Sequence, residues 1–270
     1  MKRLDVILSG RGIAKSREKA KEMILSGRVK VKGKVILKPS TAFEEDVKID
    51  LQKSDSEDYL SRGGLKLAKA IKAFNINVKD CVCMDIGAST GGFTDCMLKN
   101  GCKKVYAIDV GRGQLSKQLL CDERVENLEG TNIRYIDSNL IDLPVEFFSV
   151  DVSFISLNLV LPKIYEIVEN NACGVCLIKP QFEVGKGNVG KNGVVRDNKL
   201  RVYAINKVCN YCVEAGFSVK GLDYSPIKGP EGNIEYLIYV RKSEEATIEF
   251  SEDVKEIVRK SHTQLNYGER

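Results

Sequence analysis

From residue 81 onward, short apolar runs alternate with amphipathic segments. The apolar runs are rich in Val, Ile and Cys, which is typical of buried strands: Cys81–Asp85, Val105–Asp109, Val125–Leu128, Val150–Phe154 and Ala172–Ile178. The other segments place apolar residues at helical spacing: Phe93–Lys99, Leu115–Cys121, Leu161–Val168 and Asn198–Ala215. This alternation predicts an α/β domain with a mostly parallel sheet and helices on both faces.

The last part of the chain breaks the alternation. The strand-like runs Phe217–Tyr224 and Ile234–Arg241 follow each other with only a loop between them. A hairpin that closes a parallel sheet introduces an antiparallel strand, so we expect one such strand here. Residues 243–270 are highly charged, and we expect them to form a peripheral helix with a thin apolar stripe.

The first fifty residues have a different pattern. Two short helices are predicted, one near residues 3–10 and one at Arg17–Leu25, followed by strand-like pieces such as Val29–Val31. Together they predict a small α+β module. Residues 52–62 are polar and we interpret them as an interdomain linker, after which Gly63-Gly64 opens a further helix.

Composition excludes several classes of protein. The hydrophobic fraction of 43% is enough for a packed core, and no apolar run is long enough for a membrane span. No apolar signal region follows the basic first residues, so we expect a cytoplasmic protein.

Neither the cysteines nor the histidine predict a metal site. Cys173 and Cys176 have a zinc-like spacing, as do Cys209 and Cys212, but the first pair lies in a predicted strand, where positions three apart face opposite sides. We therefore favour buried structural cysteines and keep zinc as the minor alternative. The single histidine, His262, lies in the charged tail, so imidazole chemistry is not expected.

The net charge of +5 is unevenly distributed. Residues 1–38 carry twelve Lys or Arg and three Asp or Glu, which leaves the remainder of the chain mildly acidic. A basic head of this kind indicates a polyanionic partner, most simply nucleic acid, although a merely solvated basic face is the alternative. The basic residues that we expect to contact RNA are Arg3, Arg11, Lys15, Arg17, Lys19, Lys21, Arg28, Lys30, Lys32 and Lys34.

This head resembles the S4-type RNA-binding domain. The matching segments are Arg3-Leu-Asp, Ala14-Lys-Ser-Arg-Glu-Lys-Ala and the run from Ile24 to Val35. The resemblance implies binding of structured RNA through the basic helix and hairpin, where positive side chains follow phosphates without reading sequence.

A glycine-rich turn follows the first strand of the larger domain. An acid ends that strand, a run of small residues forms the turn, a helix begins after it, and a second acid ends the next strand. In chain order these residues are Asp85, then Gly87, Ala88, Ser89, Thr90, Gly91 and Gly92, then Phe93, and finally Asp109. Such turns hold nucleoside cofactors, since glycines allow close backbone approach and a carboxylate can bind ribose hydroxyls. A tight turn for helix–sheet packing is the alternative.

The details of the turn favour one cofactor class. A dinucleotide dehydrogenase would have a second glycine where this chain has Ser89. The acid, the small-residue turn, the second acid and the closing hairpin instead resemble the class I methyltransferases, which bind S-adenosyl-L-methionine. That resemblance implies a Rossmann-like, mostly parallel seven-stranded sheet with one antiparallel strand.

Four further polar residues stand where such a fold would gather them: Lys66, Asp151, Lys179 and Glu235. Asp151 and Lys179 lie at or near carboxyl ends of predicted parallel strands, where open α/β sheets bind ligands. Ionised groups within apolar runs are costly unless paired or used, so each could form a structural ion pair or serve catalysis.

The order Lys, Asp, Lys, Glu resembles the FtsJ-like ribose 2′-O-methyltransferases, and the chain as a whole resembles the TlyA (haemolysin A) family. Matching segments include Tyr59-Leu-Ser-Arg-Gly-Gly-Leu-Lys-Leu, Asp151-Val-Ser-Phe-Ile-Ser-Leu, Lys179-Pro-Gln-Phe-Glu and Gly232-Asn-Ile-Glu. The resemblance implies methylation of ribose 2′-hydroxyls in ribosomal RNA, cytidine being the expected nucleotide. It implies domains at 1–58 and 59–244, and residues 245–270 form a charged tail.

A chemical hypothesis assigns roles to the four residues. A ribose hydroxyl must lose its proton as it attacks the methyl group, and a neutral lysine can accept that proton. We assign Lys179 as this base, Lys66 as the residue that orients the hydroxyl, and Asp151 and Glu235 as the residues that position the lysines. Two alternatives remain open: a non-enzymatic RNA-binding or ribosome-assembly factor, and a membrane-active haemolysin.

Overall fold

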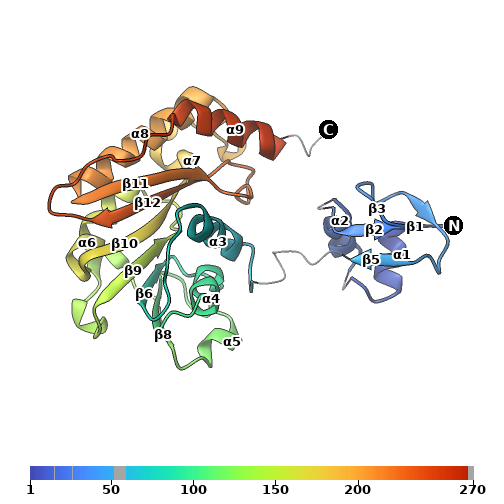
Figure 1. Cartoon of the computed structure of the whole chain (residues 1–270), viewed down its shortest axis with the longest axis horizontal. Helices are drawn as coiled ribbons and strands as arrows, with labels where there is room; N and C mark the ends of the chain where they lie inside the picture. Colours follow the sequence, from blue (N-terminus) through green and yellow to red (C-terminus); the bar gives the residue numbers. More distant parts are fainter. Residues whose placement is uncertain (15, 26, 52–58, 267–270) are drawn as a thin grey trace. The chain divides into compact units, whose positions relative to one another are not determined.

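A seven-stranded sheet forms the centre of the larger of two units, Tyr59–Arg270, in the computed structural model (Figure 1). The smaller unit comprises Met1–Asp58. The structure describes residues 1–14, 16–25, 27–51 and 59–266.

The large sheet has the strand order β11-β12-β10-β9-β6-β7-β8. Its strands are β6 (Val82–Ile86), β7 (Lys104–Asp109), β8 (Val125–Glu129), β9 (Val145–Val150), β10 (Val168–Ile178), β11 (Phe217–Tyr224) and β12 (Tyr236–Lys242). Only β12 runs antiparallel to its neighbours, β10 and β11. The predicted mostly parallel sheet with one antiparallel strand is therefore confirmed.

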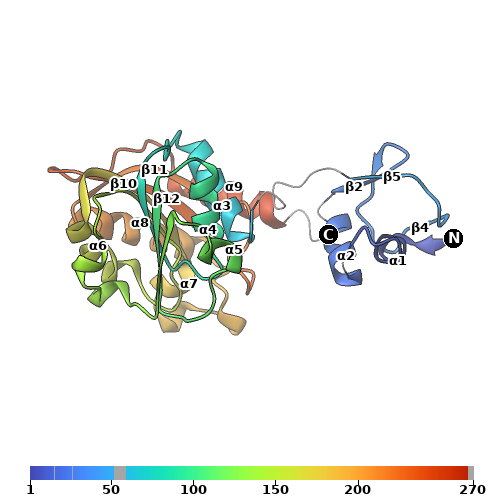
Figure 2. The ribbon, with the colours of Figure 1, turned by 90° about the horizontal axis from the view of Figure 1, so that it is seen from below.

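Helices cover both faces of this sheet (Figure 2). Strand residues alternate between the two layers: Cys83 packs in one core with α3 and α4, and its neighbour Met84 packs in the other with α6 and α8. This follows from the two-residue period of a strand. The longer helices are α3 (Gly63–Ala73), α4 (Gly92–Lys99), α6 (Leu161–Ile167), α8 (Asn198–Glu214) and α9 (Val254–Asn266).

Short helical turns occupy many of the connections. They are α5 (Lys117–Leu120), α7 (Pro180–Glu183) and the 3₁₀ turns Ile133–Tyr135, Ser138–Leu140, Leu157–Leu159, Lys186–Asn188 and Lys191–Gly193. The turn α7 begins directly after Lys179, so the chain changes from strand to helix at that lysine.

One strand prediction was wrong. The apolar run that ends at Phe154 does not stay in the sheet, because β9 ends at Val150 and the chain leaves the sheet at Asp151. Phe154 has a φ of 64° and is 92% exposed, neither of which fits a buried strand. The apolar character of Phe154 therefore did not show that this residue lies outside the strand and is exposed.

The charged C-terminal segment is more than a peripheral tail. Residues Val219 and Ile248 form a β-bridge at the edge of the sheet, and α9 packs against α8 and β11. The side chains of Ile257 and Val258 are buried in the main core. The predicted apolar stripe therefore anchors this helix to the larger unit.

The small unit combines two helices, α1 (Leu4–Gly10) and α2 (Arg17–Leu25), with an antiparallel sheet of order β3-β2-β5. Its strands are β1 (Lys2–Arg3), β2 (Val29–Val31), β3 (Lys34–Val35), β4 (Ala42–Phe43) and β5 (Ile49–Leu51), with β1 pairing to β4. Leu4, Leu8 and Ile24 lie in its separate small core.

Candidate active site

The glycine-rich turn connects β6 to α4, and Asp85 supports it from beneath. Asp85 is fully buried and accepts hydrogen bonds from the Thr94 backbone (2.8 Å), the Thr94 hydroxyl (2.6 Å) and the Ser149 hydroxyl (3.0 Å). Burial raises the pKa of Asp85 to about 6, although these hydrogen bonds oppose the shift. Asp85 thus ties the start of α4 to β6 and β9.

Two glycines of the turn bring separate elements into backbone contact. Gly87 has a φ of 84°, and a Cβ there would lie 2.6 Å from the Asp151 carbonyl oxygen. A Cβ at Gly92 would lie 2.2 Å from the Ser61 hydroxyl and 3.0 Å from the Gly64 nitrogen. Glycine is therefore needed at both positions, because the turn touches the end of β9 and the start of α3 directly.

Asp109, at the end of β7, holds the other side of the turn. Its carboxylate accepts hydrogen bonds from the Ser89 backbone (2.8 Å) and the Gly111 backbone (2.7 Å). Ser89 has a φ of 49°, a conformation that this bond helps to maintain. A carboxylate has about four acceptor positions, so Asp109 can still accept from a ribose.

The four charged residues form one continuous network. Lys66 Nζ lies 2.8 Å from Glu235 Oε2 and 3.3 Å from Asp151 Oδ2. Lys179 Nζ lies 2.6 Å from Asp151 Oδ1. Lys179 also donates a hydrogen bond to the Ser153 hydroxyl at 2.9 Å. Asp151 thus bridges the two lysines, and the predicted cluster is assembled in space.

Four different elements deliver these side chains. Lys66 lies on α3, Asp151 directly follows β9, Lys179 caps α7 after β10, and Glu235 directly precedes β12. Because β12 is antiparallel, its first residues meet the carboxyl ends of β9 and β10. The antiparallel strand is what brings Glu235 to the same edge of the sheet.

Burial and pairing determine the electrostatics of this network. Burial alone would lower the pKa of Lys66, but the charges of Asp151 and Glu235 and their hydrogen bonds outweigh it and raise that pKa. Burial would likewise raise the pKa of Asp151, yet Lys66 and Lys179 hold it below its ordinary value. Lys66 and Asp151 are therefore charged at neutral pH, although Lys66 is buried and Asp151 is mostly shielded from solvent.

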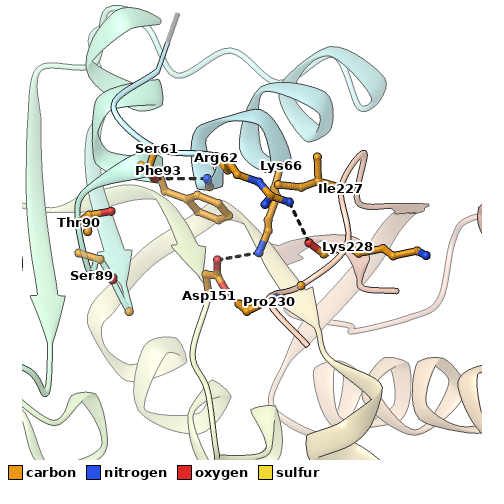
Figure 3. A pocket seen from close by; sticks show the side chains of 15 residues that line it. Ser61, Arg62, Lys66, Ser89, Thr90, Phe93, Asp151, Ile227, Lys228 and Pro230 are labelled. Carbon is orange, nitrogen blue, oxygen red and sulfur yellow. Dashed lines mark hydrogen bonds and ion pairs between the residues drawn. The ribbon is translucent and has the colours of Figure 1, made fainter. Parts of the chain in front are cut away.

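A cavity of about 490 Å³ opens between the glycine turn and this network. Its wall combines residues of the turn, the start of α3 and the loop before β12 (Figure 3). The lining residues are Ser61, Arg62, Gly63, Lys66, Gly87, Ala88, Ser89, Thr90, Gly92, Phe93, Asp151, Ile227, Lys228, Gly229 and Pro230. Asp85, Gly91, Asp109, Lys179 and Glu235, also predicted for the site, do not line it.

Sequence reasoning missed two parts of this wall. Ser61 and Arg62 fall within the predicted linker, but the Leu60 backbone donates to Asp95 at 2.8 Å, which fixes this segment against α4. The loop at 227–230 is predicted from the sequence only as a hairpin connection. The pair Gly63-Gly64 was the available signal, because a Cβ at Gly64 would meet both Tyr59 (2.5 Å) and the Gly92 carbonyl (3.0 Å).

An aromatic pair comes from the two segments that follow Asp151 and Lys179. The rings of Phe154 and Phe182 have centroids 5.2 Å apart. Phe154 is 92% exposed in a left-handed conformation. An exposed aromatic side chain held this way gives a surface on which another ring can stack.

In the small unit, most of the predicted RNA-contacting side chains reach the surface. Those that are exposed or half-exposed are Arg3, Arg11, Arg17, Lys19, Lys21, Lys30, Lys32 and Lys34. Arg28 differs, since it is only 7% exposed and lies within the domain. Lys15 lies outside the described residues.

Two of these arginines are held by a buried acid. Asp5 is fully buried and pairs with Arg3 (3.0 Å) and Arg17 (3.1 Å). Hydrogen bonds from these arginines lower the pKa of Asp5 to about 2. The positions of Arg3 and Arg17 are thus determined by the core of the domain.

Three of the four cysteines with zinc-like spacing lie in the core of the larger unit, and the fourth, Cys173, is half-buried. Cys176, Cys209 and Cys212 are all buried in its main hydrophobic cluster. Among the described residues, no group of His, Cys, Asp or Glu is arranged to hold a metal ion. In the same part of the chain, no helix is long and apolar enough to cross a membrane.

Comparison with known families divides the chain in the same way as the structure. Residues 59–242 match the FtsJ-like methyltransferase model, and residues 2–49 match the S4 domain model.

Individual relatives extend the match over almost the whole chain. The chain is 42% identical to YqxC of Bacillus subtilis, named as a candidate rRNA methyltransferase, over 97% of this chain and 95% of the relative. It is 42% identical to the Mycobacterium tuberculosis 16S/23S rRNA (cytidine-2′-O)-methyltransferase TlyA, covering 88% of this chain and 89% of that one. A solved structure from Streptococcus thermophilus, described as a candidate hemolysin, aligns with a TM-score of 0.77 at 42% identity, covering 97% and 96% of the two chains.

Proposed function

The chain belongs to the TlyA family of ribosomal RNA methyltransferases, with an S4 domain and an FtsJ-like domain, and we propose that it methylates the ribose 2′-hydroxyl of cytidine in ribosomal RNA. The observation that carries this proposal is the Asp151 carboxylate, which bridges Lys66 and Lys179 while its own backbone touches the glycine turn. Asp151 thus links Lys179, which we assign as the proton acceptor, to the turn that we assign to the cofactor.

The residues present fit S-adenosyl-L-methionine. The cavity beside the turn is of the size of a small-molecule site, and Asp109 retains acceptor positions for ribose hydroxyls. Gly87–Phe93 would hold the methionine end, and Asp109 the ribose. When bound, the cofactor supplies an electrophilic methyl group, so the protein itself must provide placement and proton transfer.

Lys179 is the residue we assign to the proton. An ammonium group cannot accept a proton, so Lys179 would first have to release one to solvent. Its Nζ would then take the hydroxyl proton while the ribose oxygen receives the methyl group and the methyl–sulfur bond breaks. Asp151 and the Ser153 hydroxyl fix the direction of that nitrogen. Lys66, held by Glu235 and Asp151, stays charged and orients the ribose oxygen.

Other features support RNA as the substrate. The exposed ring of Phe154, in the segment that follows Asp151, offers a stacking surface for an unpaired base. The exposed basic side chains of the small unit supply positive charge for phosphates. With such a substrate, the protein would work in the cytoplasm among ribosomal subunits.

The direct test uses the purified chain with tritiated S-adenosyl-L-methionine and ribosomal RNA from cells that lack the gene. We expect label in the RNA, with primer extension mapping it to 2′-oxygens of cytidines. Label in a base, or cofactor binding with no transfer to RNA, would refute the proposal. The second outcome would favour an RNA-binding factor without enzymatic activity.

A further inference from the structure

Arg62 stands at the rim of the cavity, one helical turn from Lys66. It caps the N-terminus of α3, and Lys66 follows four residues later on the same face of that helix. Both side chains line the cavity, yet Lys66 is buried and Arg62 is exposed. The helix therefore presents one cation inside the site and one at its entrance, about 6 Å apart along the axis.

The two cations differ in how fully they are paired. Lys66 is neutralised by Glu235 and Asp151. Arg62 makes no ion pair with a described residue, and its guanidinium donates one hydrogen bond, to the Lys228 carbonyl at 3.5 Å. That distance is at the weak limit for a hydrogen bond, and a guanidinium has five N–H donors. Most of its hydrogen-bonding capacity is thus left for a ligand.

The direction of Arg62 indicates which ligand. In Figure 3 its side chain runs toward Ile227 and Lys228, away from Ser89 and Thr90 of the glycine turn. A cofactor carboxylate held at the turn would lie on the side that Arg62 points away from. In a nucleotide whose 2′-oxygen lies at Lys66, the 3′-phosphate is attached to the adjacent ribose carbon. That phosphate would lie within reach of the Arg62 guanidinium at the rim of the cavity.

We propose that Arg62 binds the phosphate on the 3′ side of the target nucleotide and so positions its ribose, with the weak bond to Lys228 broken when RNA enters. This rests on the proposed function, because it requires a ribose at Lys66 and Lys179. A planar guanidinium suits the task, since it binds a phosphate through two parallel hydrogen bonds. Arg62 is then a substrate-positioning residue that acts in addition to the exposed basic side chains of the small unit.

The test compares the full-length R62Q and R62K variants with K72Q. Lys72 is an exposed cation on the same helix that does not line the cavity, which makes it the matched control. For each protein we would measure steady-state methylation of an unmodified ribosomal RNA transcript, equilibrium binding of that transcript at several salt concentrations, and calorimetric affinity for S-adenosyl-L-methionine.

For R62Q we expect the KM for RNA to rise by about tenfold or more, as for loss of a charged hydrogen bond. The slope of log affinity against log salt should fall by about one, while cofactor affinity and melting temperature stay unchanged. R62K should keep the wild-type salt slope, because the charge is retained, but its KM for RNA should still rise, by less than in R62Q.

Wild-type RNA binding and slope in R62Q would overturn the proposal. So would loss of cofactor affinity alone, which would assign Arg62 to the cofactor carboxylate. Because RNA binding is measured without turnover, failure of the methylation assay itself would count against the proposed function and not against Arg62.

Discussion

In the small unit, the lysines of the β2–β3 hairpin are exposed or half-exposed, whereas in the larger unit Lys66 and Lys179 are almost completely buried. The hairpin lysines Lys32 and Lys34 lie in solvent, where their charges act as a field on any polyanion. Lys66 and Lys179 are each fixed to within a hydrogen-bond length of a named carboxylate. Under the proposed function, the same residue type would therefore supply affinity in one place and geometry in the other.

This difference predicts how much each lysine matters singly. An exposed charge can be replaced by its neighbours, because the field is a sum over many groups. A buried lysine in a network has no substitute, since its partners are left unpaired when it is removed. Substitutions in each unit test that contrast.

The largest effect is expected for Lys179→Ala. If Lys179 accepts the proton, its loss should lower kcat by about 10²- to 10⁴-fold, the usual contribution of a positioned general base. Binding of RNA and of S-adenosyl-L-methionine should persist, because the glycine turn and the small unit are untouched. Single-turnover methyl transfer with saturating RNA isolates this chemical step.

The matched control for this variant is Lys220→Ala, which removes a lysine that pairs with Glu249 away from the cavity. That variant should keep its kcat. Turnover of Lys179→Ala close to that of the wild type would show that burial and pairing at this site serve the fold alone.

The second effect concerns two buried aspartates, one in each unit. Asp85 is surrounded by hydroxyl and backbone donors and has a pKa raised to about 6. Its contribution to stability is fully present below the unfolded pKa near 4 and is lost as the pH rises through about 6. Between pH 4 and 7 the wild type should therefore lose about 3 kcal/mol relative to Asp85→Asn, which calorimetry of both proteins would measure.

Asp5 provides the opposite sign in the same experiment. Its two arginines hold its pKa at about 2, so its contribution is present above the unfolded pKa near 4 and is lost as the pH falls through about 2. Asp5→Asn should thus be less stable than the wild type at pH 7, and the difference should disappear in acid. The same sign of pH dependence for both aspartates would contradict the contrast between an unpaired and a paired buried acid.

Sequence patterns predicted the sheet and the four-residue network for a definable reason. Parallel strands end at one edge, so residues that follow β9 and β10 meet there whatever the loops do. Glu235 was placed correctly in the cluster although it precedes β12, because the antiparallel hairpin reverses that strand. The assignment of roles to these residues came from resemblance and stays a prediction.

The cavity wall and the basic surface were less predictable. Ser61 and Arg62 reach the cavity because Gly64 and Gly92 pack backbone to backbone. The only sign of this contact in the sequence is that small residues stand at both positions. Arg28 has the same charge as its neighbours, but the β2 strand that it precedes brings it into the interior. Local composition reports charge, whereas burial depends on contacts between distant segments.

The smallest effect is expected for Lys34→Gln in the β2–β3 hairpin. If the small unit binds RNA through a summed field, removing one exposed charge should weaken binding of ribosomal RNA by less than about tenfold and lower the salt slope by about one. The kcat at saturating RNA should not change, because nothing at the glycine turn or the lysine network is altered. Lys79→Gln is the control: Lys79 is exposed and precedes β6, at the end of the sheet opposite the site. A kcat defect in Lys34→Gln at saturating RNA would mean that the hairpin also positions the target ribose, and the division between field and geometry would no longer follow the two units.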